Sequence, residues 1–241
     1  MHNGLFIAGT NTGVGKTLVT AGILRYLRRL GLDVVSMKPV QTGGILAEGR
    51  LTAPDLEFHL RAAGMEASGA ERKLMSPYVY EPACSPHLAG RMAGHYVNLD
   101  HCQACGEQLG AAHQGVLIEG AGGLMVPLNE EETQLGLAIQ LGAPVLLVAH
   151  IGLGTVNHCL LTIEALREAE VPIAGVIFNA TAPGEGEDFI GRDNPDAVAQ
   201  FGAVEVLGNL PWMGDLDREG TWDRFDESVP GLSKIESFFR P

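Results

Sequence analysis

The chain has 241 residues, of which 46% are hydrophobic and only 6% aromatic, and its formal net charge is −13. This charge repels nucleic acid and anionic lipid, and no cluster of Lys and Arg provides a local exception, so we expect neither as a partner. The longest apolar run, residues 144–149, is too short to cross a bilayer, and the first residues lack the pattern of a secretion signal, so a cytoplasmic location is expected.

Residues 9–17 read Gly-Thr-Asn-Thr-Gly-Val-Gly-Lys-Thr and lie between an apolar run at 4–8 and a helical pattern at 16–30. Glycines here let backbone N–H groups surround phosphates, the helix N-terminus adds partial positive charge, and Lys16 reaches the outer phosphates. Five residues separate Gly9 from Gly15, whereas the usual loop has four, so this phosphate-binding loop is a variant. The motif predicts a bound nucleoside triphosphate, with Thr17 as a Mg²⁺ ligand.

Further apolar runs of strand length occur at residues 34–37, 116–118, 144–149, 173–178 and 204–210. Helical spacing recurs at 98–113 and 155–170. This alternation predicts an α/β fold of the P-loop type, in which a mostly parallel sheet carries helices on both faces within a single domain over residues 1–241. Ligands of such sheets bind at the carboxyl ends of the strands, so the residues that follow each run are the candidates for function.

The second strand ends at a lysine, in the sequence Met-Lys-Pro-Val-Gln-Thr-Gly-Gly over residues 37–44. A lone lysine at a strand end is usually a solvated charge. Here Pro39 fixes its own φ and, with the glycines that follow, sets the backbone in a way that an ordinary surface turn does not require. We therefore interpret Lys38 as facing anionic oxygen.

Three oxygen-bearing side chains are candidates for a Mg²⁺ site, namely Thr17, Asp55 and Glu119. Glu119 follows the buried run 116–118 and precedes four small residues, 120–123, which we interpret as a loop able to approach a ligand closely. Asp55 follows Pro54 at the start of a helical stretch, where an ordinary first-turn acid is an equally good interpretation.

Two segments are interpreted without a function. Cys102 and Cys105 lie beside His101 in a helical pattern, and helix packing is favoured over a zinc site because the sequence offers no second pair of ligands. Reduced thiols are expected for all four cysteines. Residues 183–194 are rich in glycine and glutamate without apolar periodicity, which predicts a surface loop.

These motifs together resemble the dethiobiotin synthetase family. The resemblance rests on residues 9–17, Lys-Pro-Val-Gln-Thr-Gly at 38–43, Ser-Pro-His at 85–87, Glu-Gly-Ala-Gly-Gly at 119–123 and Gly-Leu-Gly-Thr-Val-Asn-His at 152–158. Phe-Asn at 178–179 and Leu-Pro-Trp at 210–212 extend it through nearly the whole chain. It implies an ATP- and Mg²⁺-dependent closure of 7,8-diaminopelargonic acid (7,8-diaminononanoate) with CO2 to dethiobiotin, in biotin biosynthesis.

In the implied reaction one amine captures CO2 as a carbamate, the carbamate attacks the γ-phosphorus to give a carbamic-phosphoric anhydride, and the second amine closes the ring. Lys16 and Lys38 are then the catalytic residues, because they neutralise the transferring oxygens. The metal ligands implied are Thr17, Asp55 and Glu119. The substrate contacts implied are Thr12, Thr42, Gly122, Thr155 and Asn157. The nucleotide contacts implied are Gly13, Val14, Gly15, Lys16, Thr17, Leu18, Asp55, Glu119, Gly120, Ala121, Gly122, Asn179, Leu210, Pro211 and Trp212.

The resemblance also implies a homodimer with the substrate site at its interface. In this family the substrate carboxylate reaches a helix N-terminus of the second subunit, and Gly-Thr-Val-Asn at 154–157 opens the corresponding helix. We leave His87 and His158 out of the catalytic set, because ordinary chemistry at a helix start explains both.

Two points stay open in this comparison. Gly13 stands where some relatives carry an acidic residue, so any contact of that acid with the substrate amines is absent or replaced. The loop predicts a triphosphate but not its base, so ATP is the first expectation and CTP stays open.

Two other classes of protein share parts of this pattern. A nucleotide-switch ATPase of the partitioning type would have a lysine near Asn11, and neither a basic surface nor a membrane-binding helix is evident. A cobyrinate-type amide-forming enzyme would need a glutamine amidotransferase domain with a catalytic cysteine, which we expect this chain to be too short to contain.

Overall fold

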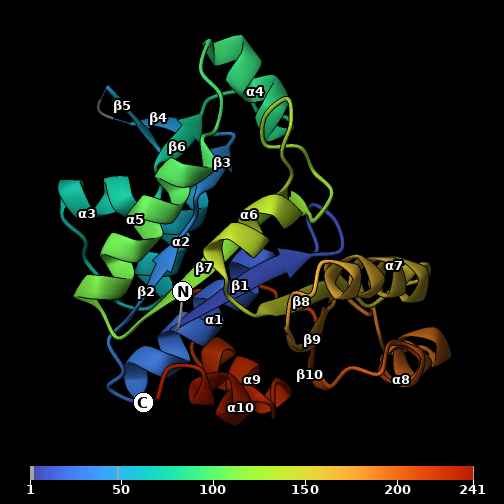
Figure 1. The fold of residues 1–241 in the computed structure, drawn as a ribbon. Coiled ribbons are helices and arrows are strands. Elements are labelled where there is room, and N and C mark those ends of the chain that lie inside the picture. The colour runs from blue at the N-terminus through green and yellow to red at the C-terminus, as the bar shows by residue number, and fades with distance from the viewer. Residues whose placement is uncertain (1–2, 48, 241) are drawn as a thin grey trace.

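A sheet of six parallel strands forms the centre of the computed structural model, which describes residues 3–47 and 49–240 (Figure 1). From one edge to the other the strands are β10 (Val206–Leu210), β9 (Ile173–Asn179), β8 (Val145–His150), β1 (Gly4–Gly9), β7 (Gly115–Gly123) and β2 (Val34–Met37). Because β7 lies between β1 and β2, residues that follow the first two strands meet residues of the seventh at one edge of the sheet.

Both faces of the sheet are buried, which explains why its strands are apolar throughout rather than alternating. Leu5 and Ile7 belong to the hydrophobic cluster on one face, while Phe6 and Ala8 belong to the cluster on the other. The first face is covered by α1 (Lys16–Arg29), α9 (Thr221–Ser228) and α10 (Leu232–Ser237). The second is covered by α5 (Leu99–Ala112), α6 (Gln134–Leu141), α7 (Thr155–Glu168) and α8 (Phe189–Gly202).

Shorter elements extend the second layer beyond the β2 edge of the sheet. The helices are α2 (Pro54–Ala62), α3 (Gly69–Met75) and α4 (Pro86–Ala93). The strands are a parallel pair, β3 (Val40–Thr42) with β6 (Tyr78–Tyr80), and an antiparallel pair, β4 (Ile45–Ala47) with β5 (Arg50–Thr52). Leu56 and Leu60 anchor α2 in the same cluster as Phe6, which places the first turn of α2 beside the end of β2.

The predicted fold class is confirmed, and the six predicted strands and three predicted helices are all present with shifts of one or two residues at most of their ends. The helix-packing interpretation of Cys102 and Cys105 is also confirmed, because both side chains are buried in α5. None of the helices in the described residues is both long and apolar enough to cross a membrane.

Two local predictions were wrong. Residues 120–123 are not a loop, because β7 continues through them to Gly123 and pairs with the end of β1. The predicted surface loop at 183–194 ends early, since α8 begins at Phe189. The side chain of Asp188 accepts a hydrogen bond from the Gly191 N–H and caps this helix, a signal that the surrounding glycines and acids concealed.

Candidate active site

The turn between β1 and α1 has the backbone of an anion-binding loop. Gly13 and Gly15 adopt φ values of 78° and 102°, in the left-handed region that glycine enters without strain. Among the described residues no side chain caps α1 at Gly15, so the first-turn N–H groups stay available. This arrangement fits a phosphate at the helix N-terminus.

Lys16 is held inside this loop. Its Nζ donates to the carbonyl oxygen of Asn11 at 3.0 Å, and the side chain is almost completely buried. Burial, and to a lesser extent the nearby charge of Lys38, lowers the pKa of Lys16 to about 8. The protein alone therefore does not fully neutralise the positive charge of the Lys16 ammonium, and this favours binding of an anion.

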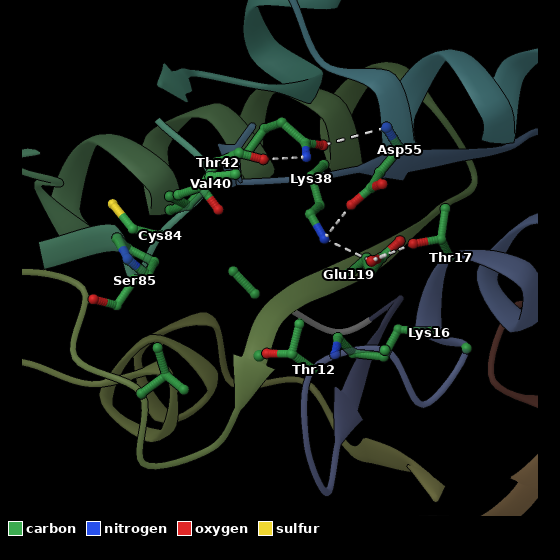
Figure 2. Close-up of a pocket in the computed structure, with 18 residues that line it drawn as sticks. Thr12, Lys16, Thr17, Lys38, Val40, Thr42, Asp55, Cys84, Ser85 and Glu119 are labelled. Atoms are coloured by element: carbon green, nitrogen blue, oxygen red, sulfur yellow. Dashed lines mark hydrogen bonds and ion pairs between the residues drawn. The ribbon is translucent and has the colours of Figure 1, made fainter. Parts of the chain in front are cut away.

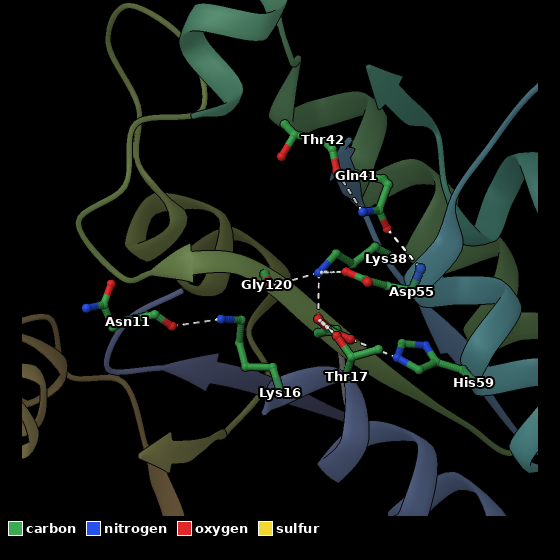
Figure 3. Close-up of polar contacts among 10 residues, drawn as sticks. Asn11, Lys16, Thr17, Lys38, Gln41, Thr42, Asp55, His59 and Gly120 are labelled. Carbon is green, nitrogen blue, oxygen red and sulfur yellow. Dashed lines mark hydrogen bonds and ion pairs between the residues drawn. The ribbon is translucent and has the colours of Figure 1, made fainter. Parts of the chain in front are cut away.

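A second lysine lies between two carboxylates (Figure 3). Lys38 follows β2, and its Nζ lies 2.6 Å from Glu119 Oε1 and 2.8 Å from Asp55 Oδ2. It also donates to the carbonyl oxygen of Gly120 at 3.3 Å, so its three N–H bonds all have acceptors. Thr17 at the start of α1 donates to the same Glu119 oxygen at 3.0 Å.

The charge state of this pair follows from its surroundings. Burial disfavours the ammonium of Lys38, but Glu119 and Asp55 outweigh that effect and raise the Lys38 pKa above its ordinary value. Burial likewise disfavours the carboxylate of Glu119, yet Lys38 and His59 hold its pKa far below the ordinary value. Both groups are charged at neutral pH, and the pair is preorganised for chemistry that moves negative charge.

Two residues of this network were missed by the sequence analysis. Gln41 Oε1 accepts from the Asp55 N–H at 3.3 Å and its Nε2 donates to the Thr42 carbonyl, which ties the start of α2 to β3. His59 Nε2 lies 2.7 Å from Glu119 Oε2. The one available signal was spacing, because His59 is four residues after Asp55 and therefore shares a helix face with it.

These groups line a cavity of about 670 Å³ (Figure 2). In the view, Cys84 and Ser85 lie on the side opposite Thr17 and Glu119, and Lys38 points toward Glu119. Of the predicted site residues, the cavity is lined by Thr12, Gly13, Gly15, Lys16, Thr17, Lys38, Thr42, Asp55, Glu119, Ala121 and Gly122. The fold therefore brings these predicted residues together from four separate segments of the chain, at 12–17, 38–42, 55 and 119–122.

The remaining predicted residues lie around this cavity or apart from it. Asn179, at the end of β9, is buried behind the loop and donates from Nδ2 to the Val14 carbonyl at 3.0 Å. Among the described residues, its Oδ1 has no hydrogen-bond partner. Trp212, after β10, is 43% exposed. The other predicted nucleotide contacts outside the lining are Val14, Leu18, Gly120, Leu210 and Pro211.

The start of α7 borders a second, smaller cavity. This cavity of about 260 Å³ is shared by the outer part of the phosphate loop and by Thr155, while Asn157 is exposed nearby on the first turn of α7. Among the described residues no side chain caps this helix at Gly154, whose φ is 92°. Thr155 and Asn157 are thus separated from the large cavity within a single chain.

Comparison with known proteins places the chain in a family. A family model described as an AAA domain matches residues 3–220. The chain is 43% identical to the ATP-dependent dethiobiotin synthetase BioD of Anaeromyxobacter dehalogenans (strain 2CP-C), over 89% of this chain and 92% of that protein. It is 36% identical to the protein of the same name from Nitrosospira multiformis, over 97% and 99% of the two chains.

Solved structures share the fold at much lower identity. The MinC:MinD cell division complex of Aquifex aeolicus aligns with a TM-score of 0.57 and 15% identity, over 99% of this chain and 94% of that chain. A ParA family ATPase from Chlorobium tepidum aligns with a TM-score of 0.52 and 10% identity, over 99% and 97%. These likenesses establish the architecture and leave the chemistry to the site.

Proposed function

The chain belongs to the family of ATP-dependent dethiobiotin synthetases, and from this premise we propose how its residues make dethiobiotin from 7,8-diaminononanoate, CO2 and ATP. It is an ATP-dependent ligase of biotin biosynthesis. The observation that carries the mechanism is the meeting of Lys16, Thr17, Lys38, Asp55 and Glu119 at one cavity.

The reaction moves negative charge at every step, which suits two lysines and no nucleophile of the protein. A substrate amine adds to CO2 and loses a proton to form a carbamate. A carbamate oxygen then attacks the γ-phosphorus and ADP leaves, and attack of the second amine on the carbonyl carbon releases phosphate and closes the ring. The task of the protein is to position these groups and to neutralise the transferring oxygens.

We assign the triphosphate to the phosphate loop and Lys16. The free N–H groups of the first turn of α1 and the αL glycines supply donors, and Lys16 exchanges its contact with the Asn11 carbonyl for phosphate oxygen. Gly13, Val14, Gly15 and Leu18 would bind through their backbones as this loop does.

Lys38 is assigned to the carbamate and the transferring phosphoryl group. Its contact with the Gly120 carbonyl is the longest of its three, at 3.3 Å, so a substrate oxygen can replace this acceptor while the two carboxylates stay paired. The carboxylates then keep the ammonium charged and aimed at the cavity. We expect Lys38→Gln to reduce turnover far more than ATP affinity.

The residues present fit a Mg²⁺ ion. Mg²⁺ prefers hard oxygen donors and usually takes only one or two carboxylates along with phosphates and water. Thr17 donates to Glu119 and Asp55 is joined to Glu119 through Lys38, so a hydroxyl and two carboxylates gather in this part of the cavity, while among the described residues no cluster of three acidic, His or Cys side chains forms a complete metal cage. When bound with ATP, the ion would neutralise phosphate charge.

The substrate and nucleotide base are assigned by position. Thr12, Thr42 and Gly122 line the cavity, with Gly122 next to Thr12, and can face the diamine and carbamate. Asn179 has an unpaired carbonyl oxygen that can accept from an exocyclic amine, as found on adenine and on cytosine alike. Leu210 ends the neighbouring strand β10, Pro211 and Trp212 follow it, and all three would flank the base. ATP is the expected nucleotide, and CTP is tested beside it.

A homodimer is proposed from the surface of α7. Leu153 and Leu161 are 87% and 63% exposed, beside the uncapped start of the helix with Thr155 and Asn157. Packing this face against a second copy would cover the leucines and bring the free N–H groups to the substrate carboxylate of the other chain. Leu161→Glu should yield monomers by analytical ultracentrifugation. A variant that stays dimeric would exclude this face as the interface.

A cytoplasmic location is proposed on the state of the cysteines. Among the described residues all four are unpaired thiols, as expected for a reducing compartment.

The test is to incubate the protein with Mg·ATP, labelled bicarbonate and 7,8-diaminononanoate and to look for labelled dethiobiotin by mass spectrometry. We expect ATP-dependent product, strongly reduced in Lys38→Gln with nearly unchanged ATP binding. ATP hydrolysis without dethiobiotin, also after CTP is tried, would refute the synthetase function and favour a nucleotide switch or an amide-forming enzyme. If Lys38→Gln reduced ATP affinity as much as turnover, Lys38 would be assigned to nucleotide binding instead.

A further inference from the structure

One buried polar side chain near the site has no role in the mechanism above. His59 lies on α2 and is completely buried, yet its Nε2 lies 2.7 Å from Glu119 Oε2 (Figure 3). Among the described residues neither ring nitrogen nor Glu119 Oε2 has a hydrogen bond of full geometry, and the short approach of Nε2 to Oε2 is the polar contact that the ring makes. The ring therefore places Nε2 against one carboxylate oxygen.

The two oxygens of Glu119 consequently have different surroundings. Oε1 faces the cavity side, where Thr17 Oγ1 lies at 3.0 Å and Lys38 Nζ at 2.6 Å. Oε2 is turned to His59. With one oxygen held on each side, the carboxylate cannot rotate without breaking a short polar contact in a place that water does not reach.

Helix α2 is built to hold this arrangement. It carries Asp55 and His59 four residues apart, and the Gln41 side chain fixes its first turn by accepting from the Asp55 N–H. The hydrophobic residues Leu56 and Leu60 of the same helix are buried in the core and set its rotation. Burying an imidazole costs more desolvation free energy than burying an aliphatic side chain. The contact with Glu119 offsets this cost and explains why a histidine occupies the position.

We propose that His59 is a positioning residue that donates its Nε2–H to Glu119 Oε2 and so presents Glu119 to the metal through Oε1 alone. The inference rests on the proposed function of Glu119 as a Mg²⁺ ligand. A proton on Nε2 can be donated to the carboxylate, whereas a proton on Nδ1 would be a buried donor without an acceptor. The tautomer with unprotonated Nδ1 is therefore favoured. Partners of ligands held in this way orient the ligand and tune its affinity for the metal.

Presentation of one oxygen also has a consequence for the choice of metal. Ca²⁺ accepts carboxylates through both oxygens at longer distances, whereas Mg²⁺ demands near-octahedral geometry with short single contacts. A carboxylate whose second oxygen is held by His59 therefore favours Mg²⁺ and Mn²⁺ over Ca²⁺.

Mn²⁺ binding measured by electron paramagnetic resonance, in the presence of ADP and without turnover, tests this role. We compare wild type with His59→Leu, which removes the donor, His59→Gln, which keeps an N–H of similar reach, and Leu109→Ala, a control in the buried core of α5. His59→Leu should weaken Mn²⁺ about 10- to 100-fold and reduce the preference for Mn²⁺ over Ca²⁺. His59→Gln should restore most of both, and Leu109→Ala should change neither despite a lower melting temperature.

Three outcomes would overturn the proposal. Unchanged Mn²⁺ affinity in His59→Leu would remove the link to the metal, and equal losses in the Leu and Gln variants would reduce His59 to packing. In the wild-type protein, ¹⁵N NMR with labelled histidine must show the Nε2–H tautomer at His59, and the Nδ1–H tautomer would refute the contact whether or not the variants fold. Wild type that binds no Mn²⁺ with ADP would instead refute the proposed metal site.

Discussion

The buried pair of Lys38 and Glu119 is the contact whose removal has the most predictable consequence. The two charged atoms lie 2.6 Å apart, and the side chains are 5% and 1% exposed, so solvent screens them little. We consider Lys38→Met, Glu119→Gln and the double variant, which remove one charge, the other, and both.

Loss of one partner leaves the other as an uncompensated buried charge, which costs about 3–5 kcal/mol. Lys38→Met should lie at the upper end, because Glu119 then keeps only its contacts with Thr17 and His59. Glu119→Gln should lie at the lower end, because Lys38 keeps Asp55 at 2.8 Å, with a side chain that is 29% exposed. The double variant should cost less than the sum by about 2–3 kcal/mol, as coupled neighbours do.

Urea unfolding followed by circular dichroism measures the four free energies of unfolding. Because domains have about 5–15 kcal/mol of stability, the single variants should stay folded at low temperature. The slope of the unfolding free energy against urea concentration should be unchanged. Since the folded-state pKa of Glu119 lies below its ordinary value of 4.5, its contribution is present above that pH and is lost as the pH falls below it. Glu119→Gln should lack this acid-dependent loss. Single costs that simply add in the double variant would refute the coupling.

Three further predictions concern other parts of the site. Because the pKa of Lys16 is lowered to about 8 in the free protein and anionic phosphate favours the charged form, ADP affinity by calorimetry should be constant below that pH and fall above it; a flat profile to pH 9.5 would refute this. Gly15→Ala places a methyl group against Asn179 at a φ of 102° and should abolish nucleotide binding, whereas Gly31→Ala, at a φ of 79° with open space, should cost only about 1 kcal/mol of stability; equal effects on binding would contradict the clash. Cys84 lines the large cavity while burial raises the pKa of the other three thiols, so it should react first with a thiol reagent and be protected by the substrates; faster labelling of a buried cysteine would contradict the packing of that region.

The elements closest to the site were predictable because their signals are local. The phosphate loop depends on glycine torsions and on the start of one helix, both written within nine residues, and β2 has the predicted bounds of Val34 to Met37. The start of α8 was missed because its cap, Asp188, stands among glycines and acids that resemble a loop. Continuation of β7 through residues 120–123 depends on pairing with β1, which a run of small residues does not reveal.

The site itself divides in the same way. The sequence identified Lys16, Thr17, Lys38 and Glu119 as separate candidates, since the first two close the phosphate-loop motif and the other two follow apolar runs of strand length. Asp55 was undecided as a first-turn acid, and only its contact with Lys38 at 2.8 Å sets it apart from a solvated one. His59 could not be identified as a site residue from the sequence, because the role of a histidine on a helix depends on the residues that it contacts in the fold.

What the sequence determined by itself is the set of local structures and the chemistry that they carry: a phosphate loop with Lys16, an α/β alternation, and Lys38 and Glu119 after apolar runs of strand length. Only the tertiary structure decided which of these groups meet. The order β1, β7, β2 places Ile7 level with Glu119 and Met37 level with Ile118, so the carboxylate from the middle strand lies between the residues that follow its two neighbours. Strand order follows from the burial of both sheet faces by helices distant in the chain, a long-range balance that no local pattern encodes.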